Sequence, residues 1–260
     1  VRDGELIHVK KDMGQNTLYR NVWILNGDSQ SLMVYIGNIQ RKLSFQKSCK
    51  KPEELAGNLA DISMEHGKIT KVSLKKERIS GKVLSVRDDA IELEGYGSVP
   101  LDTEYKVLKT YGDVKRLPLS EILVGSSSQE FVVAKGMICA VIKEREDTAK
   151  QIRVLILGDG FQDKTHQTVE ISCPGSVKEI QGEEEKELEP GSMVSVTTGD
   201  GSCSAQRLIL EPETGTELTL TSLNRSQGHP SYAGRLEILD TEEGLLLVNE
   251  LPLEDYLKKD

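Results

Sequence analysis

Strand-length apolar segments, each followed closely by a tight polar turn, recur along most of the chain. A first pair, 21–25 and 31–36, is separated by Asn26-Gly27-Asp28, and Asn-Gly is a common hairpin-turn sequence. A second pair flanks the turn 65–68. Short strands at such close spacing predict an all-β fold of small barrels or sandwiches. Further strands are expected at 79–86, 90–93, 99–101, 105–110, 131–133, 137–142, 152–157, 168–173, 193–197, 207–210 and 217–221.

The chain of 260 residues is long enough for two or three domains. We expect an N-terminal β module at 1–74 and a second small β-barrel module at 75–142. The sequence leaves open whether these two form an imperfect tandem or share strands in one larger barrel. The charged stretch 143–151 is predicted as a linker, and 152–260 as a further β-rich domain. Local expectations are a frayed or edge-strand start at 1–20, single helical turns at 52–56 and 119–123, and an exposed acidic loop at 183–187.

Charge and composition exclude several classes of ligand. A net charge of −9 opposes binding to a polyanion, so no nucleic-acid partner is expected. Aromatic residues make up 4% of the chain, too few for a broad stacking platform for sugars or bases, and Trp23 is expected to be a core or half-core anchor. The cysteines form no C-x-x-C pair and the histidines are scattered, so neither a zinc site nor a cofactor is expected. Cys173 and Cys203 could form a disulfide, but buried free thiols are the preferred interpretation.

The sequence contains neither a membrane-spanning segment nor a signal peptide. No stretch approaches the ~20 consecutive apolar residues that a spanning helix needs, and no charged region followed by an apolar one opens the chain. Because the chain begins without methionine, we interpret it as cut after an anchor. Membrane contact is expected only through an anchor that this sequence lacks.

The last stretch of the sequence predicts a hairpin that runs directly into a helix. In the first strand, 235–239, Leu236 and Ile238 alternate with polar residues, and 240–244 supplies the turn. The second strand, 244–249, is apolar on both faces, which favours a strand covered on both sides. Pro252 suits the first position of a helix, because the missing N–H is not needed there.

The predicted helix has a charged start and one apolar face. Glu254 and Asp255 place negative charge at its positive end. Leu253, Tyr256 and Leu257 lie on one side of it. The sequence stops soon after this helix begins, and isolated helices this short are marginal. We therefore expect the natural chain to continue.

This stretch also resembles a known family. Y-x-G-R-L-E-I, starting at Tyr232, and L-L-L-V-N-E-L-P-L-E-D-Y-L, ending at Leu257, resemble the opening segment of the SpoIID/LytB domain. The resemblance extends back to about Ile152, where I-R-V-L-I-L resembles the strand that opens this domain. Proteins of this family act on peptidoglycan in the bacterial cell envelope during sporulation, or enhance autolytic amidases. The residues to which the resemblance gives a signature or binding role are Arg235, Asn249, Glu250, Pro252, Glu254, Asp255 and Tyr256.

The resemblance implies a role without a catalytic residue in this chain. In the family the run continues into a V-x-P-S-E-M-type segment whose glutamate is assigned the lytic transglycosylase role, and that segment would lie beyond Asp260. Glu250 and Glu254 are the only candidate acids here, and we expect both to be structural. The resemblance thus implies the non-catalytic N-terminal region of an extracytoplasmic peptidoglycan-remodelling protein, inactive alone.

The implied partners are peptidoglycan glycan strands, with a cell-wall amidase or an envelope complex as further partners. The alternative is a non-catalytic surface-binding or scaffold protein, or an amidase enhancer that acts through a hydrolase. The sequence does not decide between a sporulation and a vegetative role.

Overall fold

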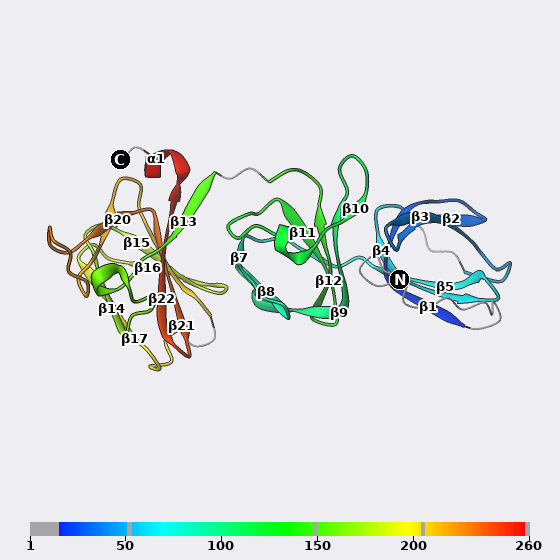
Figure 1. The fold of residues 1–260 in the computed structure, drawn as a ribbon. Helices are drawn as coiled ribbons and strands as arrows, with labels where there is room; N and C mark the ends of the chain where they lie inside the picture. Colours follow the sequence, from blue (N-terminus) through cyan, green and yellow to red (C-terminus); the bar gives the residue numbers. More distant parts are fainter. Residues whose placement is uncertain (1–15, 51–53, 148–149, 204–205, 258–260) are drawn as a thin grey trace.

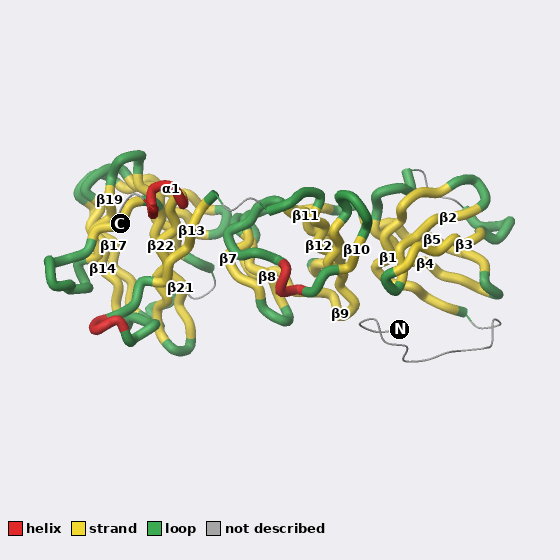
Figure 2. Tube along the Cα trace, turned by 45° about the horizontal axis from the view of Figure 1, so that its top comes forward, coloured by secondary structure: helices red, strands yellow, loops and turns green. Residues whose placement is uncertain are grey.

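The structure is a computed structural model that describes residues 16–50, 54–147, 150–203 and 206–257. Three β units follow one another in a row, with the N-terminal unit at one end and the C-terminal unit at the other (Figure 1). Helix is confined to three short segments of the described chain (Figure 2). The all-β prediction is confirmed.

Two local predictions fall partly on residues that the structure leaves undescribed. Most of the start predicted as frayed or as an edge strand, 1–15, lies outside the described residues. So do 51–53, which include the first residues of the helical turn predicted at 52–56.

The N-terminal unit is a five-stranded antiparallel sheet with the order β3-β2-β1-β4-β5. Its strands are β1 (Thr17–Gly27), β2 (Ser31–Ile36), β3 (Ile39–Ser44), β4 (Leu59–Glu65) and β5 (Lys68–Lys75). A single parallel bridge joins Phe45, just after β3, to Ile69 in β5, so the two ends of the sheet approach one another. The curled sheet encloses the buried side chains of Ile24, Leu32 and Ile62.

The first hairpin turn lies later than predicted. β1 continues through Gly27, where the sequence indicated the turn. The carboxylate of Asp28 instead accepts hydrogen bonds from the backbone N–H groups of Gln30 and Ser31, both at 2.7 Å. This side-chain turn satisfies two backbone donors, which explains why the chain reverses after Gly27 and not at Asn-Gly.

The middle unit is a seven-stranded sheet. Its elements are β6 (Arg78–Ile79), β7 (Val83–Val86), β8 (Ala90–Leu93), β9 (Gly97–Lys109), β10 (Lys115–Arg116), the 3₁₀ turn η1 (Leu119–Glu121), β11 (Gln129–Ala134) and β12 (Met137–Lys143). The strand order is β6-β11-β12-β9-β8-β7, with β10 beside β9. The long strand β9 pairs antiparallel with β8 and parallel with β12. η1 confirms the helical turn predicted at 119–123.

This middle sheet is strongly curled but not closed. β6 and β7 stand at opposite ends of the strand order, yet only residues 80–82 separate them along the chain. The ends must therefore come together, and the loop residue Ser126 accepts a hydrogen bond from the N–H of Val83 in β7. Among the described strands no ladder joins the two ends, so the barrel that we predicted here is an open one.

The C-terminal unit is a sandwich of two sheets with the orders β13-β22-β21-β18-β15-β16 and β17-β14-β19-β20. Its elements are β13 (Gln151–Leu155), η2 (Asp159–Phe161), β14 (Thr168–Cys173), β15 (Val177–Gln181), β16 (Glu184–Leu188), β17 (Ser192–Thr197), β18 (Leu208–Pro212), β19 (Glu217–Leu220), β20 (Ser231–Ala233), β21 (Arg235–Thr241), β22 (Gly244–Pro252) and α1 (Leu253–Leu257). Side chains such as Ile171, Leu210 and Leu247, from both sheets, form one buried core.

Two sequence predictions in this unit are corrected. The acidic run 183–187, predicted as a loop, forms most of β16, an edge strand paired with β15. Backbone pairing at a sheet edge needs no apolar side chain, so the strand left no apolar pattern. Pro252 is the last residue of β22 rather than the first of the helix, and it pairs with Gln151. Its missing N–H is tolerated at the end of a strand.

Two other hairpin turns agree with the sequence. His66-Gly67 joins β4 to β5, and Lys135-Gly136 joins β11 to β12. Both central residues have positive φ in each case, as a type I′ turn requires. Glycine occupies the second central position of both turns, and it adopts a positive φ without a steric penalty.

The N-terminal and middle units meet through an apolar interface. Trp23 of β1 and Leu59 of β4 pack with Leu108, Ala140 and Ile142 of the middle unit. Trp23 is 7% exposed. The predicted core anchor therefore lies between two units, where a large apolar surface is removed from water.

A small polar group borders this apolar interface. Arg20 and Asp102 form an ion pair at 3.2 Å across the two units. The amide of Asn21 donates to the carboxylate of Asp102 at 3.3 Å and to the carbonyl of Glu104 at 3.1 Å. These contacts satisfy the buried polar groups beside the cluster.

The connection between the middle and C-terminal units is tied to the middle unit. Lys143, at the end of β12, forms an ion pair with Asp147 at 2.5 Å and donates to the carbonyl of Glu121 at 2.9 Å. Ser126 and Ser128 donate to the Asp147 carboxylate. The charged stretch predicted as a linker thus has buried polar anchors in its described part; 148–149 lie outside it.

Candidate functional site

The family-like residues lie on the hairpin of β21 and β22 and on α1. The two strands pair in the register Arg235 with Glu250 and Leu236 with Asn249. Leu245 and Leu247 point into the sandwich core. The structure thus brings three of the sequence-predicted residues, Arg235, Asn249 and Glu250, to one end of the hairpin.

Asn249 fixes the backbone at the start of β21. Its side-chain amide donates to the carbonyls of Ala233 at 2.9 Å and Arg235 at 3.0 Å. Between them, Gly234 has φ +81°, and a Cβ there would lie 2.3 Å from the carbonyl oxygen of Glu250. Only glycine fits this close approach, which accounts for the glycine in Y-x-G-R.

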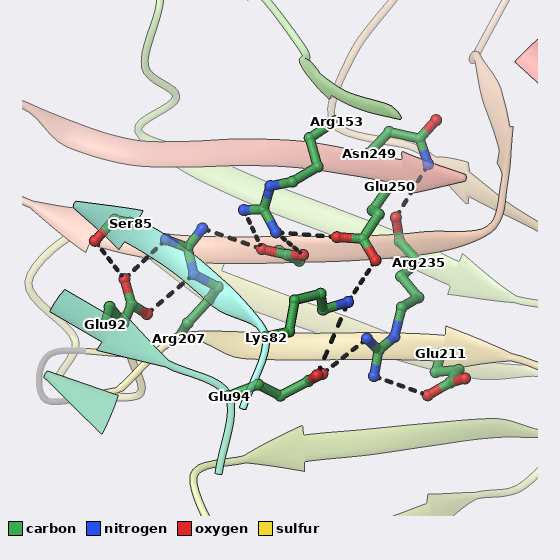
Figure 3. A network of polar contacts seen from close by, with 11 residues as sticks. Lys82, Ser85, Glu92, Glu94, Arg153, Arg207, Glu211, Arg235, Asn249 and Glu250 are labelled. Carbon is green, nitrogen blue, oxygen red and sulfur yellow. Dashed lines mark hydrogen bonds and ion pairs between the residues drawn. The ribbon is translucent and has the colours of Figure 1, made fainter. Parts of the chain in front are cut away.

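Glu250 is a buried, fully paired carboxylate. Its side chain has no exposed surface. One oxygen pairs with Lys82, from the segment between β6 and β7 of the middle unit, and the other accepts from Arg153 of β13 at 3.0 Å (Figure 3). The carboxylate therefore joins the middle unit to the C-terminal unit.

A second buried carboxylate, Glu237 of β21, lies beside it. Arg153 donates to both oxygens of Glu237, at 2.7 and 2.8 Å. Arg207 approaches Glu237 at 3.2 Å and also donates to both oxygens of Glu92 in the middle unit, at 3.1 and 3.0 Å. Two-point contacts of this kind hold the arginine planes in one orientation.

The remaining contacts extend this charged interface to its edge. Arg235 pairs with Glu94 of the middle unit at 2.7 Å and with Glu211 at 3.0 Å. Lys82 lies 3.9 Å from Glu94. We call the whole set the charged network; its members are Lys82, Glu92, Glu94, Arg153, Arg207, Glu211, Arg235, Glu237 and Glu250. All of them except Glu237 are labelled in Figure 3.

The charged network shifts the pKa values of Glu92, Glu237 and Glu250, and not all in the same direction. Burial raises the pKa of Glu250, but the hydrogen bond and charge of Lys82 and the charge of Arg153 outweigh it and leave this pKa below its ordinary value. Glu92 is likewise buried, and Arg207 lowers its pKa. At Glu237 burial outweighs the two arginines, so its pKa is raised.

This environment makes Glu250 a poor candidate for an acid catalyst. A general acid for glycan cleavage needs a raised pKa and a place in a cleft. Glu250 has a lowered pKa and no exposed surface. Its contacts support the structural role expected for it.

The other predicted site residues lie apart from the charged network. Pro252, Glu254, Asp255 and Tyr256 have exposed side chains at the end of β22 and on α1. The two acids stand in the first turn of α1, as predicted. The N–H of Leu253 donates to the carbonyl of Lys150 at 3.0 Å, which holds the start of α1 beside β13.

Sequence reasoning missed most of the charged network. Lys82, Glu92 and Glu94 come from the middle unit, and nothing in their local sequence indicates an ion-pair partner. Glu237 and Arg153 offered a signal: each carries a charge in the middle of an apolar strand. A charge at such a position usually has a buried partner.

The described residues contain no group of three or more His, Cys, Asp and Glu side chains that could hold a metal ion. Cys49, Cys139, Cys173 and Cys203 are buried, and none of them takes part in a disulfide in the described part of the chain. Burial raises the pKa of the thiols of Cys139, Cys173 and Cys203, which favours their unreactive protonated form. In the described part of the chain no helix has the length and apolar character needed to cross a membrane.

Comparison of the chain with protein-family models, curated proteins and solved structures found no match.

Proposed function

We propose that this chain is the non-catalytic part of a SpoIID/LytB-type protein that remodels peptidoglycan in the bacterial cell envelope. In this proposal the row of β units holds the end of α1 in a fixed position. A catalytic segment following α1 would be presented to the glycan strand from there.

One observation carries the proposal: the family-like residues with buried side chains hold the hairpin and the adjoining unit together. Asn249 binds the backbone around Gly234, and Glu250 and Arg235 reach across to Lys82 and Glu94. A segment whose polar residues fix its own orientation suits the positioning of a neighbouring catalytic group.

The lowered pKa of Glu250 supports the non-catalytic part of the proposal. The same observation favours a second candidate function, a scaffold or amidase enhancer, in which a partner hydrolase cleaves the wall.

Purified peptidoglycan sacculi test the proposal. We expect residues 1–260 to co-sediment with sacculi and to release no anhydro-muropeptides, as read by mass spectrometry. The product of the natural gene, expressed through to its own stop codon, is expected to release them. Failure to co-sediment would overturn the peptidoglycan assignment, and product release by residues 1–260 would overturn the non-catalytic role.

An added cell-wall amidase separates the two candidates. If residues 1–260 accelerate peptide release by the amidase and the natural gene product releases no anhydro-muropeptides, the enhancer role replaces the positioning role.

A further inference from the structure

A depression of about 650 Å³ lies in the C-terminal unit between η2 and the loop that joins β19 to β20. This loop is at the end of the molecule away from the middle unit (Figure 1). The depression is therefore separate from the charged network. Its lining includes Phe161, Arg225, Gln227, His229 and Tyr232.

Phe161 presents an aromatic ring that is both exposed and held in place. Its side chain is 68% exposed. The guanidinium of Arg225 lies over the ring, 4.1 Å from its centroid, and donates to the carbonyls of Leu157 at 2.6 Å and Gly158 at 2.9 Å. The ring is thus supported by a side chain that is itself anchored to the backbone.

The backbone at Phe161 is strained. Its φ is +59°, in the left-handed region that non-glycine residues rarely occupy. Such conformations cost free energy and gather at binding and catalytic sites. Because the ring of Phe161 is exposed, burial in the core does not offset the free-energy cost of this backbone conformation. The position of Phe161 therefore requires another explanation.

The opposite wall of the depression is a tight hairpin tip. Arg225 and Gly228 exchange two backbone hydrogen bonds, both of 2.9 Å, around Ser226 and Gln227. His229 uses Nδ1 for a hydrogen bond with the carbonyl of Leu223 at 2.9 Å. The loop is therefore held by its own hydrogen bonds before any ligand arrives, which lowers the entropy cost of binding.

The lining has the chemistry of a sugar site. The side-chain amides and hydroxyls of Asn224, Ser226, Gln227 and Ser231 share the lining with the Phe161 ring, and no carboxylate-bearing residue is among the lining residues. Sugar rings offer a C–H face that stacks on an aromatic ring, and hydroxyls that bond to amides. A polyanion is disfavoured, because acidic residues outnumber basic ones in 150–257.

We propose that this depression binds one sugar residue of a glycan chain, stacked on the face of the exposed Phe161 ring that Arg225 does not cover. Aromatic residues are too scarce in this chain to form a broad stacking platform for sugars, but one supported ring is enough for a single sugar. The choice of an N-acetylated hexosamine as that sugar rests on the proposed function. The site would hold the glycan strand at the end of the molecule opposite the middle unit.

Binding of the N-acetylglucosamine tetramer, measured by titration calorimetry with residues 1–260, tests this site. The variant is Phe161→Asn, since asparagine tolerates the left-handed backbone while it removes the ring and, with it, the contact to Arg225. We expect its affinity to fall roughly tenfold, the loss of one aromatic stacking contact. Met193→Ala, which removes another exposed apolar side chain of the same unit, should bind as the wild type.

Each outcome separates this site from the proposed function. Absence of tetramer binding by the wild type, or equal binding by Phe161→Asn, would overturn the site even if the chain still co-sediments with sacculi. Tetramer binding that depends on Phe161 without sacculus binding would retain the site and reject the peptidoglycan assignment. A tenfold loss confined to Phe161→Asn, with intact sacculus binding by the wild type, would support both.

Discussion

The three β units are joined by two interfaces of opposite chemistry. Between the N-terminal and middle units, Trp23 and Leu59 pack on apolar side chains, with polar groups at the border. Between the middle and C-terminal units, the small apolar cluster of Leu84, Ile180 and Ile209 accompanies the charged network. One contact depends on removal of apolar surface from water and the other on matched charges.

The two interfaces differ in how strictly they fix the relative orientation of the units that they join. Apolar packing is non-directional and tolerates small changes of angle. Buried ion pairs add little net stability, but two-point arginine contacts are satisfied in one geometry only. The charged network is therefore suited to fixing the C-terminal hairpin relative to the middle unit, which the proposed function requires.

Glu250→Gln is expected to have the largest effect on this comparison. Lys82 would keep its charge at the interface without the buried carboxylate that neutralises it, at a cost of about 3–5 kcal/mol. Urea unfolding followed by circular dichroism measures the change. Hydrogen exchange of β21 and β22 should rise as well.

Glu254→Gln is the matched control for that variant. It removes the same type of charge from an exposed position, and we expect a change within about 0.5 kcal/mol. Equal effects of the two substitutions would contradict a special role for the buried carboxylate.

Trp23→Ala tests the apolar interface and should cost about 3 kcal/mol through lost packing. This loss should be the same at low and high salt, since no charge is removed. The loss caused by Glu250→Gln should change with salt. If the stability loss of Trp23→Ala depended on salt, the contrast between the two interfaces would be wrong. Leu18→Ala, at an exposed position on the same strand, is the control for Trp23→Ala.

In the wild type, Trp23 also reports selectively on one interface. It is the only tryptophan in the chain, so its fluorescence follows separation of the N-terminal and middle units.

Gly234→Ala tests how closely the start of β21 must approach β22 beside the charged network. The added Cβ would meet the Glu250 carbonyl at 2.3 Å, so we expect a loss of at least about 2 kcal/mol. Gly37→Ala has a similar positive φ but open space around it, and should cost only about 1 kcal/mol. Urea unfolding measures the loss of stability for both variants. Equal losses would mean that positive φ alone, and not the clash with Glu250, destabilises Gly234→Ala.

Acid pH should weaken the charged interface. The lowered pKa values of Glu92 and Glu250 mean that their stabilisation is present above the ordinary glutamate pKa and is lost as pH falls through the lower folded values. Glu237, whose pKa is raised, acts in the opposite direction, because the folded state binds its proton first. We therefore expect a moderate loss on acidification, smaller than that of Glu250→Gln.

Two measurements made across the same pH range check this prediction. The protection factors of the amides in β21 and β22, corrected for the intrinsic exchange rate at each pH, should decrease at acid pH, while Trp23 fluorescence stays constant. Simultaneous loss of both signals would contradict independent interfaces.

Sequence patterns predicted several local elements, inside and outside the site, well. Strands β21 and β22, the acidic first turn of α1 and the type I′ turns at His66 and Lys135 all follow from neighbouring residues. The turn at Asp28 and the edge strand β16 were missed, because a side-chain turn and backbone pairing at an edge leave no periodic apolar signal.

The sequence by itself determined most of the strands and several of the turns, because those choices depend on residues a few positions apart. Only the tertiary structure decided what the charged residues do. Lys82 and Glu250 are 168 positions apart, and the pairing of their charges exists only once two units have folded and docked. At Glu250 the charges of Lys82 and Arg153, brought together by that docking, outweigh burial and lower the pKa of the carboxyl.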